Sequence, residues 1–252
     1  MGYDIIVVGS CNVDLTNYVD RAPQPGETII ANSFETNFGG KGANQAVMAK
    51  LMGGKVSLVA KIGSDFFGTS YLDHLSAIDV NHDHIQRCSD APTGTATIIV
   101  TSEGQNCIII NPGANKKVDS VYVQHVLPPL LIGAKLLLVQ MEIDPEATLL
   151  ALKLAKSQSV LTIFNTAPAT TGITEEFFRF TDVLCCNEIE LQQLTSADCV
   201  ANPAEIITGG RILMEAGCPS IIVTLGEKGA ILFDNKFPGG FEVKIPIKID
   251  KV

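Results

Sequence analysis

The sequence predicts an α/β fold, namely a doubly wound, mainly parallel sheet with helices on both faces and a small inserted β lid. Short apolar runs recur along the 252 residues and are near-continuous rather than alternating, which is typical of parallel strands covered on both faces. Helical patterns lie between these runs, and that alternation is typical of a doubly wound sheet. Two further segments are rich in strand-forming residues with no helix between, and they predict the lid.

The expected strands of the main sheet are spread along the whole chain. The apolar runs are IIVVG, VSLVAKIG, KLLLVQMEI, VLTIFN, DVLCCN and SIIVTLG, at residues 5–9, 56–63, 135–143, 160–165, 182–187 and 220–226. The lid segments, residues 15–38 and 93–110, contain Pro-Gly and Glu-Gly turns and predict a small antiparallel sheet. We expect residues 1–252 to form one domain that carries this lid.

The clearest helical pattern covers residues 144–158. Asp144 is a suitable N-cap, and Pro145 suits the first helical position. The expected apolar face consists of Leu149, Leu150, Leu152 and Leu154.

Composition excludes several classes of partner. The net charge of −9 disfavours nucleic acid and anionic membranes, which reward clustered Lys and Arg. The first residues show no signal peptide and no membrane span, so we expect a cytoplasmic protein. The seven cysteines show no CxxC spacing, and we expect free thiols rather than disulfides or a zinc site.

Polar residues follow the ends of several predicted strands, where an open parallel sheet binds its ligands. Any one of them is most often an ordinary loop or cap residue, but the agreement of five strand ends favours a site. These residues are Asn12, Asp14, Glu142, Asn165, Asn187, Glu190 and Thr224 to Gly226.

A glycine-rich segment, NFGGKGANQAV, occupies residues 37–47. It lacks the GxxxxGK[ST] pattern of a P-loop, and Gln45 stands where GxGxxG needs its last glycine. One interpretation is that Gly40 and its neighbours let backbone approach a ligand while Lys41 and Asn44 donate to its oxygens. A plain glycine-rich turn into a helix explains the residues equally well.

Several motifs together resemble the ribokinases of the pfkB-type carbohydrate kinase family. The motifs are VVGSCNVDL, NFGGKGANQAV, PTGTATIIV, GQNCIIINPGAN, FNTAPA, NEIE and TLGEKG, in the order and at the kind of spacing found there. The resemblance implies a ribokinase-like fold and ATP-dependent phosphorylation of D-ribose to ribose 5-phosphate. It also implies a lid that covers the sugar and a possible homodimer formed through that lid.

The resemblance assigns roles to individual residues. The implied sugar-binding residues are Asn12, Asp14, Gly40, Lys41, Asn44 and Glu142. Asn187, Thr224, Gly226 and Gly229 match ATP-binding positions, and Glu190 completes an NxxE motif implied to organise Mg²⁺. Potassium is the monovalent cation that the family is expected to use.

One family motif is absent from residues 1–252. Ribokinases carry a GAGD sequence after a segment like FEVKIPIKIDKV, and its Asp is the implied catalytic base. The resemblance places this Asp beyond Val252, so no catalytic residue is assigned here. We therefore expect the 252-residue chain to be impaired in phosphoryl transfer.

Two alternatives to an impaired kinase are open. One is a non-catalytic sugar-binding or regulatory isoform that retains the ribose site. The other is an unrelated dehydrogenase, which is disfavoured because GxGxxG is missing.

Overall fold

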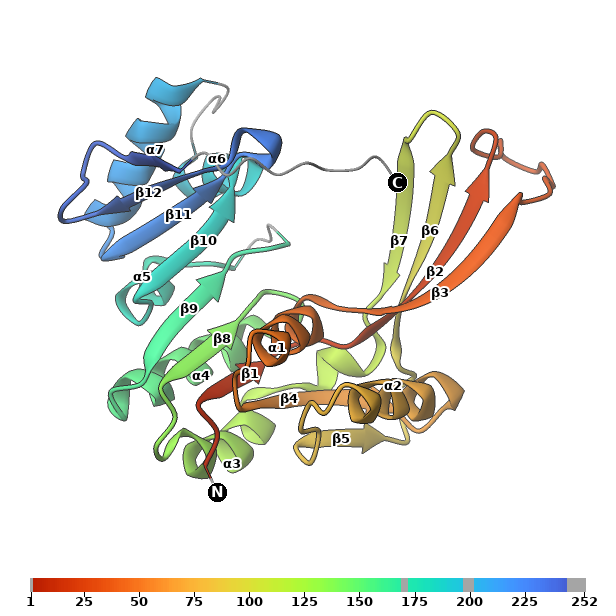
Figure 1. Ribbon diagram of the computed structural model, residues 1–252, viewed down its shortest axis with the longest axis horizontal. Helices are drawn as coiled ribbons and strands as arrows, with labels where there is room; N and C mark the ends of the chain where they lie inside the picture. Colours follow the sequence, from red (N-terminus) through yellow and green to blue (C-terminus); the bar gives the residue numbers. More distant parts are fainter. Residues whose placement is uncertain (1, 169–171, 197–201, 244–252) are drawn as a thin grey trace.

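The computed structural model describes residues 2–168, 172–196 and 202–243, and a nine-stranded sheet runs through the molecule (Figure 1). Its strands are β1 (Ile5–Val8), β4 (Val56–Gly63), β5 (Ile85–Cys88), β8 (Leu136–Val139), β9 (Leu161–Asn165), β10 (Val183–Asn187), β11 (Ser220–Thr224), β12 (Ala230–Asp234) and β13 (Phe241–Val243). The strand order is β13-β12-β11-β10-β9-β8-β1-β4-β5, and only β12 and β13 run antiparallel to their neighbours. The predicted mainly parallel α/β fold is confirmed.

Helices cover both faces of this sheet. They are α1 (Lys41–Leu51), α2 (Phe66–Ala77), α3 (Ser120–Leu131), α4 (Pro145–Ser157), α5 (Glu175–Arg179), α6 (Glu188–Thr195) and α7 (Pro203–Glu215), with short 3₁₀ turns η1 (Gly113–Lys117) and η2 (Gly226–Lys228). Successive residues of β1 point to opposite faces. Val7 therefore packs in a core cluster with α1 and α2, whereas Ile6 and Val8 join a second cluster with α3 and α4.

The strands β9 to β11 are less covered on one face than their near-continuous apolar runs predict, and the neighbouring β12 shows the same pattern of burial. Ile163, Cys185, Ile222 and Leu232 alternate with fully buried neighbours but are themselves only half-buried. Within the described residues, none of these four belongs to either core cluster. The apolar runs therefore overestimate the burial of this face, because each run contains both the covered and the less covered side chains.

Helix α4 forms where the sequence predicts it, but its buried face differs. Asp144 caps the helix by accepting a hydrogen bond from Glu146 N at 3.0 Å. The buried face is made mainly of alanines, because small side chains let the helix lie close to the sheet. Of the four predicted leucines only Leu152 is buried, beside Ala147, Thr148, Ala151 and Ala155.

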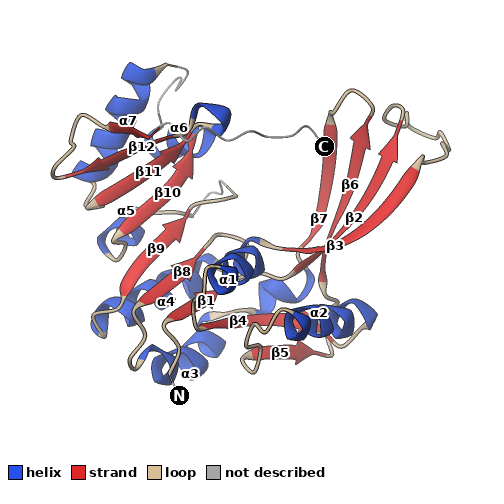
Figure 2. Cartoon of the chain, in the orientation of Figure 1, coloured by secondary structure: helices blue, strands red, loops and turns tan. Residues whose placement is uncertain are grey.

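A second sheet projects from the main one, as Figure 2 shows. Its strands are β2 (Asn12–Val19), β3 (Ser33–Gly39), β6 (Gly94–Thr101) and β7 (Asn106–Asn111), in the order β3-β2-β6-β7. We call this four-stranded sheet the lid. Both hairpins are antiparallel, but the central pair β2–β6 is parallel, so the prediction of a purely antiparallel sheet is wrong. Strands β2 and β6 both enter the lid from the main sheet, and they therefore run in the same direction.

The six cysteines in the described part of the chain are all free, and Cys199 lies outside it. The prediction of free thiols is thus confirmed for those six. Among the described residues, no helix has both the length and the apolar character needed to cross a membrane.

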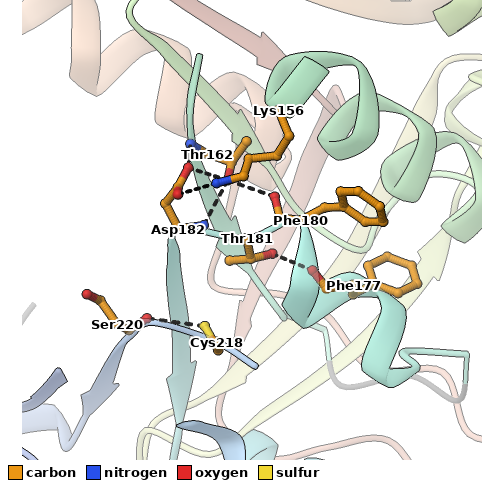
Figure 3. A network of polar contacts seen from close by, with 8 residues as sticks. All are labelled: Lys156, Thr162, Phe177, Phe180, Thr181, Asp182, Cys218 and Ser220. Carbon is orange, nitrogen blue, oxygen red and sulfur yellow. Dashed lines mark hydrogen bonds and ion pairs between the residues drawn. The ribbon is translucent and has the colours of Figure 1, made fainter. Parts of the chain in front are cut away.

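A polar network ties the starts of β9 and β10 to the end of α4 (Figure 3). The Asp182 carboxylate accepts hydrogen bonds from Lys156 Nζ at 2.5 Å and from the backbone N–H of Thr162 at 2.9 Å. The Asp182 N–H in turn donates to Thr162 Oγ1 at 2.8 Å. Partial burial alone would raise the pKa of Asp182, but these hydrogen bonds, that of Lys156 first, lower it below the usual value.

Replacing Asp182 with asparagine is expected to destabilise the protein by about 1–2 kcal/mol near neutral pH, because it removes charge-assisted hydrogen bonds. A carboxylate with a lowered folded-state pKa stabilises the fold above its unfolded-state pKa, and this contribution is lost as the pH falls through the folded value. The difference in the free energy of unfolding between wild type and Asp182→Asn should therefore be smaller at about pH 3.5 than at about pH 7. Urea unfolding at both pH values measures it.

The matched control for this prediction is Asp73→Asn, which neutralises an exposed aspartate on α2. We expect that variant to unfold like wild type at both pH values. A loss of stability in Asp182→Asn that stayed the same at acid pH would contradict the role assigned to the charge.

Candidate functional site

The candidate site lies at the carboxyl edge of the main sheet, where the chain passes from β1 into β2. Strand β1 has β4 on one side and β8 on the other, so the order in which the chain adds strands to the sheet reverses at β1, and such a reversal opens a crevice at the carboxyl ends of the strands. A cavity of about 420 Å³ lies there. Its polar lining includes Asn12, Asn115 and Glu142, and Ile110 of the lid contributes to its apolar lining.

Asn12 and Asp14 follow β1, as the sequence predicts, and they already belong to the next strand, β2. Pairing with both β3 and β6 extends the strand back to Asn12, so polar residues that follow β1 become part of the lid. Asn12 is 5% exposed and accepts a hydrogen bond from Asn115 Nδ2 at 2.7 Å. Asp14 is half-buried, one pleat further along the same face.

The carboxyl group of Asp14 titrates above its usual range. Burial raises the pKa of Asp14, and the negative charge of Glu142 raises it further. The Glu142 carboxylate lines the cavity, and the carboxylate of Asp14 lies close enough to be affected by its charge. Such a pair accepts hydrogen bonds from hydroxyl groups, which supply the protons that the carboxylates lack.

Glu142 also fixes the start of α1. Its Oε2 accepts hydrogen bonds from Ser10 Oγ at 2.5 Å and from the first helical N–H, that of Lys41, at 2.9 Å. Gly42 N donates to the same serine oxygen at 3.2 Å. A carboxylate is favourable at this position because a helix N-terminus carries partial positive charge and unpaired N–H groups.

The glycine-rich segment brings the start of α1 against the backbone of residues 10–12. Gly40 has φ 93°, and a Cβ added there would lie 2.7 Å from Asn12 N. A Cβ on Gly42 would lie 2.5 Å from Ser10 N. The glycines therefore serve the turn into the helix, and their predicted approach to a ligand stays a prediction. Lys41 is half-buried and Asn44, one turn into α1, is exposed.

The predicted metal residues have a clear structural role. Asn187 and Glu190 form a capping box at the start of α6: Asn187 N donates to Glu190 Oε2 at 2.9 Å, and Glu190 N donates to Asn187 Oδ1 at 2.8 Å. Glu190 is only 7% exposed. The described residues contain no cluster of three or more His, Cys, Asp or Glu side chains suited to a metal ion. A single carboxylate fits Mg²⁺ that keeps several water ligands.

The predicted ATP-binding residues come together at the same edge of the sheet. Asn187 and Thr224 are direct neighbours in the register of β10 and β11. After Thr224 the chain turns tightly, with φ 57° at Gly226 and 98° at Gly229, and Leu225 N donates to Gly229 O at 2.8 Å. Thr224 is exposed. Only β9 and β8 separate these strands from β1. The predicted ATP-binding residues and the predicted sugar-binding residues that follow β1 therefore lie along one edge of the sheet.

The predicted place of the catalytic base lies outside the described residues. The resemblance puts that aspartate beyond Val252, whereas the described part of the chain ends at Val243 and does not include residues 244–252. The expectation that the base lies beyond Val252 therefore stays a prediction.

Two buried polar residues of the site were not assigned from the sequence. Ser10 is fully buried and bonded to Glu142, and Asn115 is 1% exposed and bonded to Asn12. Both lie inside quoted motifs, VVGSCNVDL and NPGAN, which were the available signal. Their partners are distant in sequence, by 132 and 103 residues, so local patterns do not reveal the contacts.

Comparisons with known proteins identify the family of this chain. A family model for the pfkB family carbohydrate kinases matches residues 3–252. The ribokinase of Mus musculus is 39% identical over 234 residues, which are 93% of this chain and 72% of the mouse protein. The deoxyribokinase of Salmonella typhi is 33% identical over 228 residues, which are 90% of this chain and 74% of that protein.

A solved structure gives the same result for the fold. The structure of Arabidopsis thaliana ribokinase complexed with ribose and ATP has a TM-score of 0.84 at 30% identity, covering 94% of this chain and 76% of that one. The family match spans nearly the whole chain, and the mouse relative is similar over most of it. The chain therefore belongs to the pfkB family of carbohydrate kinases and is a ribokinase-like member of it.

Proposed function

We propose that this chain provides the substrate sites for ATP-dependent phosphorylation of D-ribose to ribose 5-phosphate. The observation that carries the proposal is the cavity lined by Asn12, Asn115 and Glu142 at the N-terminus of α1, with Asp14 close enough for the charge of Glu142 to raise its pKa. In the proposed roles these carboxylates accept hydrogen bonds from sugar hydroxyls. Buried polar groups of this kind reject a sugar that lacks the matching hydroxyl, because they would then be left unpaired. Asn12, Gly40, Lys41 and Asn44 complete the proposed sugar site.

ATP is proposed to bind along the carboxyl ends of β10 and β11, at Asn187, Thr224, Gly226 and Gly229. The exposed turn after Thr224 supports this assignment, since its backbone is accessible. Glu190 is proposed to hold Mg²⁺ through water molecules. The ion would supply positive charge that neutralises the phosphates during transfer.

The lid is proposed to cover the sugar and to form the contact of a homodimer. Covering the site excludes water, which protects the phosphoryl donor from hydrolysis. Apolar side chains of the lid are exposed, with 57% of Phe34 and 64% of Ile109 accessible. Such a surface is typical of a protein interface. Potassium activation and a cytoplasmic location stay predictions.

No GAGD sequence occurs within these 252 residues. For this polypeptide the proposal is therefore binding of sugar and nucleotide with slow phosphoryl transfer. The loss of a general base alone costs about 100-fold to 10,000-fold in rate. A non-catalytic sugar-binding role remains the alternative function, and it predicts ribose binding with no turnover at all.

The test combines calorimetric titration with an ATP-consumption assay on the purified 252-residue polypeptide, with magnesium and potassium present. We expect saturable binding of D-ribose, weaker binding of 2-deoxy-D-ribose, and turnover close to background. Preference for the deoxy sugar would move the proposal towards a deoxyribokinase, and rapid ribose-dependent turnover would overturn the expected impairment. A folded polypeptide that binds no pentose would overturn the proposed function. Sedimentation equilibrium on the same preparation tests the dimer.

A further inference from the structure

The amide of Asn115 has an orientation that the backbone fixes. Its Oδ1 accepts from Cys11 N at 2.9 Å, and its Nδ2 donates to Cys11 O at 3.1 Å. A backbone N–H can only donate and a carbonyl can only accept, so the two ends of this amide are assigned by their partners. Asn115 is 1% exposed, and the reversed orientation would leave two buried pairs of like groups facing each other.

The fixed orientation of Asn115 also determines the orientation of the Asn12 amide. The second proton of Asn115 Nδ2 is donated to Asn12 Oδ1 at 2.7 Å. Asn12 must therefore turn its oxygen towards Asn115 and its Nδ2 away from it. The backbone of Gly94 in β6 packs directly against these two amides, since a Cβ added there would lie 2.3 Å from both Asn115 Nδ2 and Asn12 Oδ1. Rearrangement of the pair is thus opposed by backbone on two sides.

Asn12 lines the cavity, and within the described residues its Nδ2 donates no hydrogen bond to another protein group. We propose that Asn115 is a positioning residue that fixes Asn12 as a hydrogen-bond donor towards the cavity. The inference rests on the proposed sugar site. Asp14 and Glu142 can only accept, so a donor at Asn12 lets one hydroxyl accept from the amide and donate to a carboxylate. A group that only donates could not accept from the Asn12 amide, whereas a hydroxyl can. By orienting Asn12, Asn115 thereby makes the site prefer hydroxyl groups.

Asn115→Asp tests this directly because the two side chains have the same shape. The aspartate cannot donate, so Asn12 is expected to turn its Nδ2 towards it and its oxygen towards the cavity. D-ribose affinity should fall roughly tenfold. The discrimination between ribose and its 2-deoxy or 3-deoxy analogue, whichever binds more weakly to wild type, should shrink as well. A purely structural role would weaken all these sugars by the same factor, and that result would overturn the proposal.

Asn12→Asp is the second variant, for the case in which Asn115→Asp does not fold. It keeps an acceptor for Asn115 but replaces the donor in the cavity, so ribose affinity should again fall roughly tenfold. Asn106→Asp, an isosteric change at the exposed start of β7, is the control and should bind ribose like wild type. Unchanged ribose affinity in both test variants would overturn the proposal.

A sugar-free readout separates this inference from the proposed function. In wild type the Nδ2 protons of Asn12 should exchange quickly with solvent by NMR, whereas those of Asn115 should exchange slowly. In Asn115→Asp the Asn12 protons should become slow. Slow exchange at Asn12 in wild type would overturn the inference even if ribose binds. Failure of wild type to bind ribose, with the expected exchange pattern, would instead overturn only the proposed function.

Discussion

Asp14→Ala is expected to lower the affinity for D-ribose by about 100-fold or more and to leave the fold intact. Hydrogen bonds to a charged acceptor are among the strongest in a binding site, and their loss leaves a sugar hydroxyl desolvated without a partner. Asp14 lies in β2, where the backbone pairs with β3 and β6 and does not depend on the side chain. Calorimetric titration with ribose measures the loss.

The stability of this variant follows from the raised pKa of Asp14. Burial and the charge of Glu142 raise it, so the ionised carboxylate is less favourable in the folded chain than in the unfolded one. This cost is present once the pH exceeds the folded-state pKa. Removing the carboxylate should therefore leave the sugar-free protein at least as stable as wild type near pH 7. A clear loss of stability would show that Asp14 supports the fold instead.

Ribose binding by wild type should also weaken in acid. Protonation of Asp14 removes an acceptor, and its pKa lies above the ordinary aspartate value of 3.8. The decline should begin at a higher pH than for an ordinary aspartate. The control Asp73→Ala removes an exposed carboxylate of α2 and should change neither the affinity nor its pH dependence. Equal ribose affinity in Asp14→Ala and wild type would remove Asp14 from the site.

The main sheet could be predicted from the sequence because its parallel strands are apolar runs bounded by polar residues. β4 was located at its observed bounds, and Asn165, Asn187 and Thr224 do end their strands. β5, β12 and β13 were not predicted. β5 and β13 form the two edges of the sheet and β12 lies beside β13, at positions where fewer side chains must be apolar. A strand at such an edge leaves a weaker pattern than a central one.

The site was harder to predict because its geometry depends on contacts between distant segments. The spacing of Asn187 and Glu190 matches both a family motif and a capping box, and the structure contains the capping box. The sequence cannot separate these roles, since one pair of side chains can serve both. Asn115 shows the opposite difficulty. Its partners, Cys11 and Asn12, are more than a hundred residues away, so the motif NPGAN marks the segment but does not reveal which residues Asn115 contacts.

Glu142→Gln is expected to lower ribose affinity by about 30-fold to 100-fold and to destabilise the protein by about 1 kcal/mol. Glutamine can still accept from Ser10 Oγ and from the N–H of Lys41 through its remaining oxygen, so the start of α1 should keep its position. The charge at the helix N-terminus is lost, however, and the side chain gains a donor where the carboxylate could only accept. Sugar titration and urea unfolding measure the two effects.

The same variant makes a prediction about its neighbour. The charge of Glu142 helps to raise the pKa of Asp14, so removing it should lower that pKa towards the ordinary value, which NMR titration can follow. Glu146→Gln removes an equal charge from an exposed position at the start of α4, four residues away, and should leave both the Asp14 pKa and ribose affinity unchanged. Suppose that Glu142→Gln lost stability but bound ribose normally. Glu142 would then serve only to hold α1, and the acceptors for the sugar would have to lie elsewhere in the cavity.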